Sequence, residues 1–130
     1  MSGVSITPMP GARTATRTVL LIEDDAEVRE VCAQVLSDEG YAVHAASDGV
    51  SGIAQLDCMP DVIVLDLVMP RMDGWEFMRR LRAVAGHERT PVLLLTATAS
   101  SGAALAGAQA ILRKTFVVEA LLRQVADLSP

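Results

Sequence analysis

Five side chains that could take part in chemistry lie within two positions after the short apolar runs of the sequence. They are Glu23, Asp24, Asp66, Thr96 and Lys114. Carboxylates held close together repel one another, so a cluster of them favours a bound cation. Oxygen ligands without paired His or Cys select a hard ion, and Mg²⁺ commonly acts beside phosphate. A carboxylate next to Mg²⁺, with an amine and a hydroxyl directed at the same point, can accept a phosphoryl group.

Strands and helices must alternate along the chain to bring these residues together. The apolar runs predict strands at 19–22, 41–46, 62–65, 92–95 and 110–112. Apolar residues recur at helical spacing at 28–36, 50–56, 77–81 and 118–125. Strands that are apolar on both faces and alternate with helices indicate a parallel sheet covered on both sides. We therefore expect an α/β fold of the flavodoxin-like, doubly wound kind, with five strands in the order 2-1-3-4-5.

This fold makes a prediction about where the chemistry lies. In an open parallel sheet, ligands bind beyond the carboxyl ends of the strands, where the strand order reverses. The reactive residues follow the predicted strands directly, so they should converge on that rim. The sequence thus predicts an acidic, magnesium-binding phosphoacceptor site with one amine beside it.

Four segments of the sequence carry a family resemblance. They are Leu21-Ile22-Glu23-Asp24-Asp25, the run from Val62 to Gly74 (VIVLDLVMPRMDG), Leu94-Leu95-Thr96-Ala97, and Lys114. Together they resemble the receiver domain of bacterial two-component response regulators, the CheY-like domain. The resemblance covers residues 18–128, which suggests one receiver domain and a single-domain response regulator. Residues 1–17, rich in Ser, Thr, Pro, Gly and Ala, are expected to form a flexible tail.

The resemblance implies a role for each site residue. Asp66 would be the phosphoacceptor, and Asp24 would bind Mg²⁺ directly. Glu23 would act through water, and the Val68 backbone carbonyl would complete the protein's share of the metal ligands. Thr96 would bond the phosphoryl group, and Lys114 would pair with it. Asp25 would cap the following helix instead of binding the metal.

Each of these residues also has a simpler interpretation. Asp66 could merely end a strand, and Glu23 and Asp24 could be ordinary loop acids before a helix. Threonine is common at strand ends, and a single lysine is usually a solvated surface charge. Lys114 is nevertheless the only lysine among 11 basic residues, which suggests a position that needs a compact ammonium group.

The sequence departs from the family around the fourth helix and fifth strand. Thr115 stands where receivers usually have a proline after the lysine, and Ile111 stands where an aromatic residue usually reports phosphorylation. The segment 97–109 is short and rich in small residues, so the fourth helix is expected to be short or disordered. We expect phosphorylation to be relayed through that segment instead of through an aromatic switch.

Composition excludes several classes of protein. The net charge of −5 and the scattered arginines argue against nucleic-acid binding. No apolar run approaches the roughly 20 residues that span a bilayer, and no secretion signal is apparent, so a cytoplasmic protein is expected. The two cysteines suggest no disulfide framework. His44 and His87 have no acidic or cysteine partner at ligand spacing, so both are expected at the surface.

The function that these observations favour is that of a phosphorelay receiver. A sensor histidine kinase or phosphotransfer protein would donate the phosphoryl group to Asp66, and phosphorylation would alter binding to a downstream protein. We expect no separate substrate turnover, only magnesium-dependent self-phosphorylation and autodephosphorylation. The alternative is a receiver-fold interaction module that works without phosphorylation. An aspartyl phosphatase would need an acid at position 68, where the chain has valine.

Overall fold

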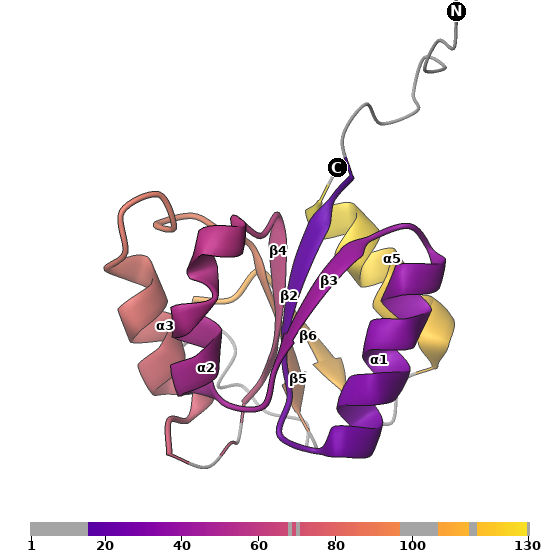
Figure 1. Cartoon of the computed structure of the whole chain (residues 1–130), viewed down its shortest axis with the longest axis horizontal. Coiled ribbons are helices and arrows are strands. Elements are labelled where there is room, and N and C mark those ends of the chain that lie inside the picture. The colour runs from indigo at the N-terminus through magenta and orange to yellow at the C-terminus, as the bar shows by residue number, and fades with distance from the viewer. Residues whose placement is uncertain (1–15, 68, 70, 97–106, 115–116, 130) are drawn as a thin grey trace, which may run out of the picture.

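Five parallel strands form a single sheet in the structure, a computed structural model that describes residues 16–129 except 68, 70, 97–106 and 115–116. The strands are β2 (Thr18–Ile22), β3 (Ala42–Ala46), β4 (Val62–Asp66), β5 (Val92–Thr96) and β6 (Ala110–Arg113). Their order across the sheet is β3-β2-β4-β5-β6 (Figure 1). Counted along the chain, this is the predicted order 2-1-3-4-5, so the fold prediction is confirmed.

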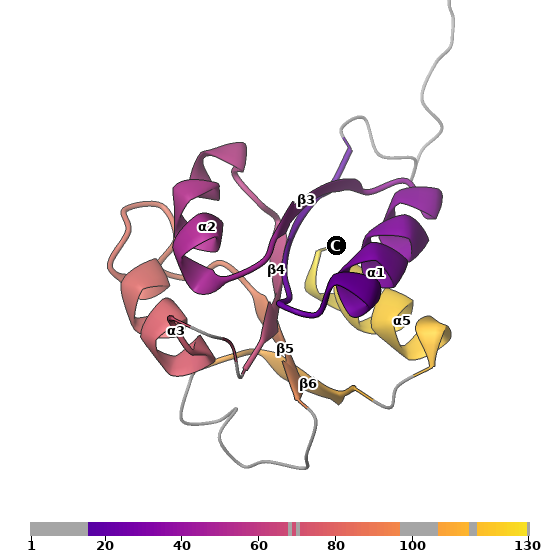
Figure 2. The same cartoon turned by 60° about the horizontal axis from the view of Figure 1, so that its bottom comes forward.

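Helices cover both faces of the sheet (Figures 1 and 2). Two of them, α1 (Ala26–Asp38) and α5 (Val118–Leu128), lie on one face. The other two, α2 (Gly49–Ala54) and α3 (Gly74–Arg82), lie on the opposite face, and a short 3₁₀ helix (Leu56–Cys58) follows α2. Each face therefore has its own apolar core, with the sheet between them.

Alternate residues of each central strand enter alternate cores. In β2, Leu20 and Ile22 pack beneath α2 and α3, whereas Val19 and Leu21 pack beneath α1 and α5. Every residue of β4 and β5 is buried. Because side chains of a strand point to opposite faces in turn, a strand buried on both faces must be apolar where it lies between the two cores. The polar residues Asp66 and Thr96 stand only at the ends of β4 and β5.

An aspartate caps the N-terminus of three of the helices. Asp25 accepts hydrogen bonds from the backbone N–H groups of Glu27 and Val28 at the start of α1. Asp48 caps α2 and Asp73 caps α3 in the same way. The predicted capping role of Asp25 is thus confirmed, and its carboxylate is directed at the helix and not at the acidic site.

Several predictions fall outside the described residues. They concern most of the tail (1–17), most of the fourth helix (97–109), the Val68 carbonyl and Thr115. Among the residues that the structure describes, none of the helices is both long and apolar enough to span a bilayer.

Candidate functional site

Three carboxylates meet at the carboxyl ends of β2 and β4. Glu23 and Asp24 follow β2, and Asp66 is the last residue of β4. One oxygen from each of the three side chains lies within 4.8 Å of the others. Glu23 and Asp66 are buried, with 0% and 2% of their surface exposed, whereas Asp24 is exposed. The predicted convergence of these acids at the rim of the sheet is therefore observed.

Lys114 enters the same cluster from the end of β6. Its Nζ lies 3.0 Å from Asp66 Oδ2, 3.0 Å from Glu23 Oε1 and 3.1 Å from Glu23 Oε2. The backbone N–H of Lys114 donates to the carbonyl of Thr96 over 2.7 Å, which ties Lys114 to the end of β5. The lone lysine thus neutralises part of the charge of two buried acids.

Backbone contacts hold Glu23 and Asp24 in place. Glu23 Oε2 accepts a hydrogen bond from the N–H of Asp25 over 3.0 Å. The guanidinium of Arg29, one turn into α1, donates to the carbonyl oxygens of Glu23 (2.7 Å) and Asp24 (3.4 Å). Arg29 is half-buried, because its guanidinium lies against the loop that precedes α1.

The pKa values in the cluster are shifted by burial and by neighbouring charges. Burial, reinforced by the Asp24 carboxylate, raises the pKa of Asp66 to about 7 although Lys114 opposes the change. A hydrogen bond with Asp66 lowers the pKa of the more exposed Asp24. Burial alone would lower the pKa of Lys114, but Asp66 and Glu23 outweigh it and raise that pKa. The site therefore holds more negative charge than its one ammonium group balances.

These residues fit a divalent cation. Three carboxylates against one lysine leave a net charge of −2 when all are ionised. Glu23 Oε1 is buried and, among the described residues, accepts no hydrogen bond although Lys114 Nζ lies nearby. A hard ion such as Mg²⁺ suits this site for three reasons. All the donors are oxygens, the site has an excess of negative charge, and one buried oxygen accepts no hydrogen bond.

Thr96 and Val68 complete the predicted set of site residues. Thr96 is the last residue of β5 and is buried, with 4% of its surface exposed. It lies at the same rim as Asp66, since β4 and β5 are neighbours in the sheet. Val68 lies outside the described residues, so its carbonyl has no position here.

The prediction that His87 lies at the surface is wrong. His87 is buried, with 4% of its surface exposed, and its Nδ1 lies 2.9 Å from the hydroxyl oxygen of Thr90. Arg82 donates to the carbonyl oxygens of both residues, so the loop after α3 closes on itself. The prediction considered only acidic and cysteine residues near His87 in the sequence, so it could not reveal a partner that is a hydroxyl group. His44, by contrast, is exposed on the edge strand β3 as expected.

Comparison with known proteins decides the family. The model of the response regulator receiver domain matches residues 19–126. The chain belongs to the response-regulator receiver family. Receiver domains serve signal transduction in two-component systems, and the match agrees with a phosphoacceptor role for this one.

Full-length relatives are longer than this receiver. Response regulator MprA of Mycobacterium sp. (strain KMS) is 39% identical over 112 residues, covering 82% of this chain and 48% of MprA. MprA of Mycobacterium leprae (strain TN) is also 39% identical over 112 residues, which cover 82% of this chain and 48% of that protein. The chain thus spans about half the length of the curated relatives it matches.

Solved structures match over nearly their whole length. Chemotaxis protein CheY4 of Vibrio cholerae superimposes with a TM-score of 0.83 at 33% identity, covering 88% of this chain and 99% of CheY4. The receiver domain of sensor histidine kinase PA1611 from Pseudomonas aeruginosa PAO1 gives a TM-score of 0.81 at 29% identity, covering 88% and 98%. The latter structure holds a magnesium ion coordinated in its active site cleft.

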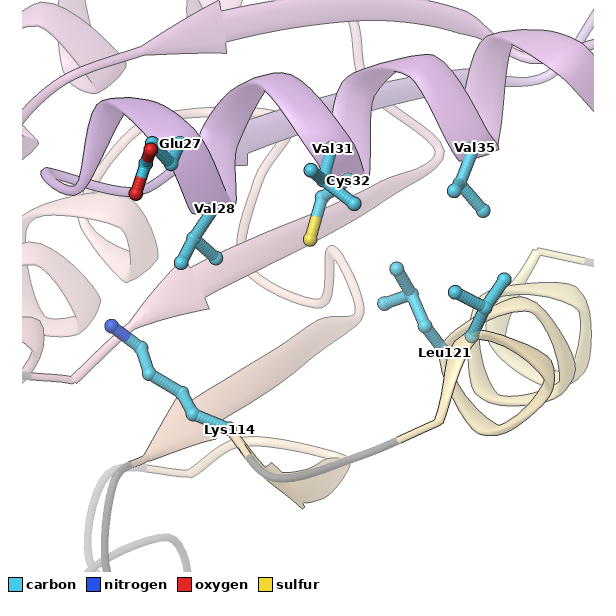
Figure 3. A pocket seen from close by; sticks show the side chains of 8 residues that line it. Glu27, Val28, Val31, Cys32, Val35, Lys114 and Leu121 are labelled. Atoms are coloured by element: carbon cyan, nitrogen blue, oxygen red, sulfur yellow. The ribbon is translucent and has the colours of Figure 1, made fainter.

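An apolar groove between α1 and α5 adjoins the acidic cluster (Figure 3). It encloses about 240 Å³, and its lining includes Val28, Val31, Cys32, Val35, Lys114 and Leu121. The stem of Lys114 forms one end of the groove, while its Nζ reaches the acids. Cys32, at the base, is buried, which raises the pKa of its thiol to about 11 and keeps it unreactive at neutral pH.

Proposed function

We propose that this receiver accepts a phosphoryl group on Asp66 with Mg²⁺ as its cofactor. The observation that carries the proposal is the arrangement of Asp66 with Glu23, Asp24 and Lys114. Asp66 is the carboxylate at the centre of this arrangement, because it ends a buried strand between the other two acids and the lysine. Such a group can act as nucleophile while its neighbours hold the countercharge.

Each residue has a defined part in the transfer. An Asp66 carboxylate oxygen forms the new bond to phosphorus, and the bond from phosphorus to the donor's leaving group breaks with its electron pair. Glu23 and Asp24 would hold Mg²⁺, with the Val68 carbonyl as a further ligand. When bound, the ion neutralises charge on the phosphoryl oxygens. Lys114, already 3.0 Å from Asp66 Oδ2, would pair with the transferred group. The Thr96 hydroxyl would donate to one of its oxygens.

The donor is proposed to be a sensor histidine kinase or a phosphotransfer protein. Its docking surface would be the face of α1 that borders the α1–α5 groove, because Lys114 lies both in this groove and at Asp66. The groove is smaller than a typical small-molecule site of roughly 300–1,000 Å³. It suits apolar side chains of a partner helix, and the exposed Glu27 and Glu30 beside it favour basic residues on that partner.

Intact-mass measurement with a small phosphodonor tests the proposal. The protein is incubated with acetyl phosphate in Mg²⁺ or in EDTA, and Asp66→Asn is the variant. We expect a mass gain of one phosphoryl group in the wild type with Mg²⁺ and none in EDTA or in Asp66→Asn. An unmodified wild type under all conditions would overturn the proposal, as would equal labelling of Asp66→Asn.

A second candidate function is a receiver-fold module that binds its partner without phosphorylation. The half-buried Ile111 on β6 favours it, because an aliphatic side chain cannot act as the family's aromatic reporter. Binding to a captured downstream protein would then be equal with and without a phosphoryl group on Asp66. Under the first proposal, binding to that protein depends on phosphorylation of Asp66. The first proposal also includes a cytoplasmic location for this receiver.

A further inference from the structure

Arg71 in the loop between β4 and α3 forms an ion pair that the acidic site does not explain. Its side chain is 64% exposed, yet its guanidinium pairs with Asp48, whose side chain is 8% exposed. The backbone of Arg71 has a φ of 70°, a left-handed conformation that costs energy for most residues. The surrounding structure must therefore favour this conformation.

Asp48 is a fixed anchor for Arg71. Its Oδ1 accepts a hydrogen bond from the backbone N–H of Ser51 over 2.8 Å and caps α2, while its Oδ2 faces Arg71. Both oxygens are thus in use. The hydrogen bond from Ser51, and then Arg71, lower the pKa of Asp48, which therefore stays charged. Arg71 is consequently tied to the N-terminus of a helix and not to a mobile side chain.

Other contacts fix the same loop at its base. The N–H of Leu67 donates to the carbonyl of Leu95 over 3.0 Å, and the N–H of Gly74 donates to the carbonyl of Leu67 over 2.8 Å. Next to Arg71, towards α3, Met72 packs on α2 so closely that a Cβ at Gly49 would lie 2.8 Å from its Sδ. The ion pair lies beside this contact, on the stretch that follows directly from Asp66.

We propose that Arg71 is a positioning residue for metal binding, because it ties its own part of the loop to α2 and so helps to fix Leu67 and the adjoining Asp66 as the metal site requires. This inference rests on the proposed function, because it concerns Mg²⁺ at Asp66. Arg71 acts through Asp48 and the loop, and it contacts neither the metal nor the phosphoryl group. Residues that orient metal ligands from outside commonly change metal affinity by about 10–100-fold.

The sign of the effect separates positioning from simple electrostatics. Removing a positive charge near the site would strengthen Mg²⁺ binding, because Arg71 repels the ion. Loss of positioning would weaken it. Arg71→Asn is the informative variant, since asparagine tolerates a positive φ and the backbone can keep its conformation. Arg79→Asn is the matched control, because Arg79 is a comparably exposed arginine paired with Glu76 on α3.

The experiment is calorimetric titration of Mg²⁺ into the wild type, Arg71→Asn, Arg71→Lys, Asp48→Asn, the double variant Arg71→Asn/Asp48→Asn, and Arg79→Asn. Urea unfolding in EDTA, followed by the single tryptophan Trp75, shows that each variant is folded. We expect Arg71→Asn to weaken Mg²⁺ binding about tenfold. Arg71→Lys should restore most of the affinity, and Arg79→Asn should match the wild type. The double variant should be no weaker than Asp48→Asn.

Unchanged or tighter Mg²⁺ binding by Arg71→Asn would overturn the inference and leave the proposed function intact. So would a lower stability of Arg71→Asn in EDTA with unchanged affinity, because that result indicates a purely structural role. A wild type that binds no Mg²⁺ would contradict the proposed function itself and the inference with it.

Discussion

Asp66→Asn should make the metal-free protein more stable, although it removes the proposed nucleophile. Raising the pKa of Asp66 from 3.8 to about 7 corresponds to roughly 4 kcal/mol of cost for ionising this side chain in the folded state. Asparagine has nearly the same shape and no charge, and its carbonyl can still accept from Lys114. Because the site can relax, we expect a gain of about 2–4 kcal/mol in the free energy of unfolding at pH 8. That gain corresponds to an increase in Tm of about 10 °C.

The gain should depend on pH in a defined way. Between pH 3.8 and about 7, folded Asp66 holds a proton that the unfolded chain has released. The stability of the wild type therefore falls as the pH rises through this range, whereas Asp66→Asn lacks this contribution. The difference between the two proteins should be small at pH 4, grow up to pH 7, and stay constant above it.

Urea unfolding at pH 4, 6 and 8 in EDTA measures this difference. Asp57→Asn is the control, since it makes the same change of charge at an exposed position. Addition of Mg²⁺ at pH 8 should stabilise the wild type more than Asp66→Asn and narrow the difference. A variant that is less stable than the wild type at pH 8 would refute the reasoning, as would a difference independent of pH.

Four further substitutions test other parts of the account. Asp24→Asn should lower the affinity for Mg²⁺ at least about tenfold in a calorimetric titration, because it removes a proposed direct ligand. Lys114→Arg should slow labelling by acetyl phosphate about tenfold or more, since a planar fork replaces a compact ammonium between two acids. Val31→Glu, at a 58% exposed position on α1, should impair transfer from the kinase but leave acetyl phosphate labelling unchanged. Gly52→Ala should reduce stability by about 1–3 kcal/mol in urea unfolding, despite better helix propensity, because the new Cβ would lie 2.5 Å from Ile22 Cδ1.

The fold could be predicted from the sequence because its signals are local and repeated. Buried parallel strands such as β4 and β5 require unbroken apolar runs, and the residues directly after such runs must lie at the carboxyl rim. The positions of Glu23, Asp24 and Asp66 follow from that rule. Lys114 reaches the same place from 48 residues beyond Asp66, and only the family resemblance indicated that it pairs there.

The contacts that support the site and its loops could not be predicted from the sequence. They depend on which residues meet in the folded structure, and the spacing of apolar residues does not indicate that. Arg29 looks like a solvent-facing charge at its helical position, yet it bonds carbonyls of the preceding loop. Arg71 and Asp48 are 23 positions apart and belong to different elements. His87 lacks an acidic or cysteine partner in sequence, but Thr90 supplies a hydroxyl once the loop closes. Each contact depends on the tertiary arrangement that the strands establish first.

Chemical identification of the modified residue tests the central claim most directly. The protein is incubated with acetyl phosphate and Mg²⁺ and then reduced with borohydride, which converts an aspartyl phosphate to homoserine and releases phosphate. Peptide sequencing by mass spectrometry should find homoserine at position 66, and omission of the phosphodonor should abolish it. Homoserine at another aspartate, or none in a protein whose intact mass had increased, would contradict the assignment of Asp66 as the phosphoacceptor.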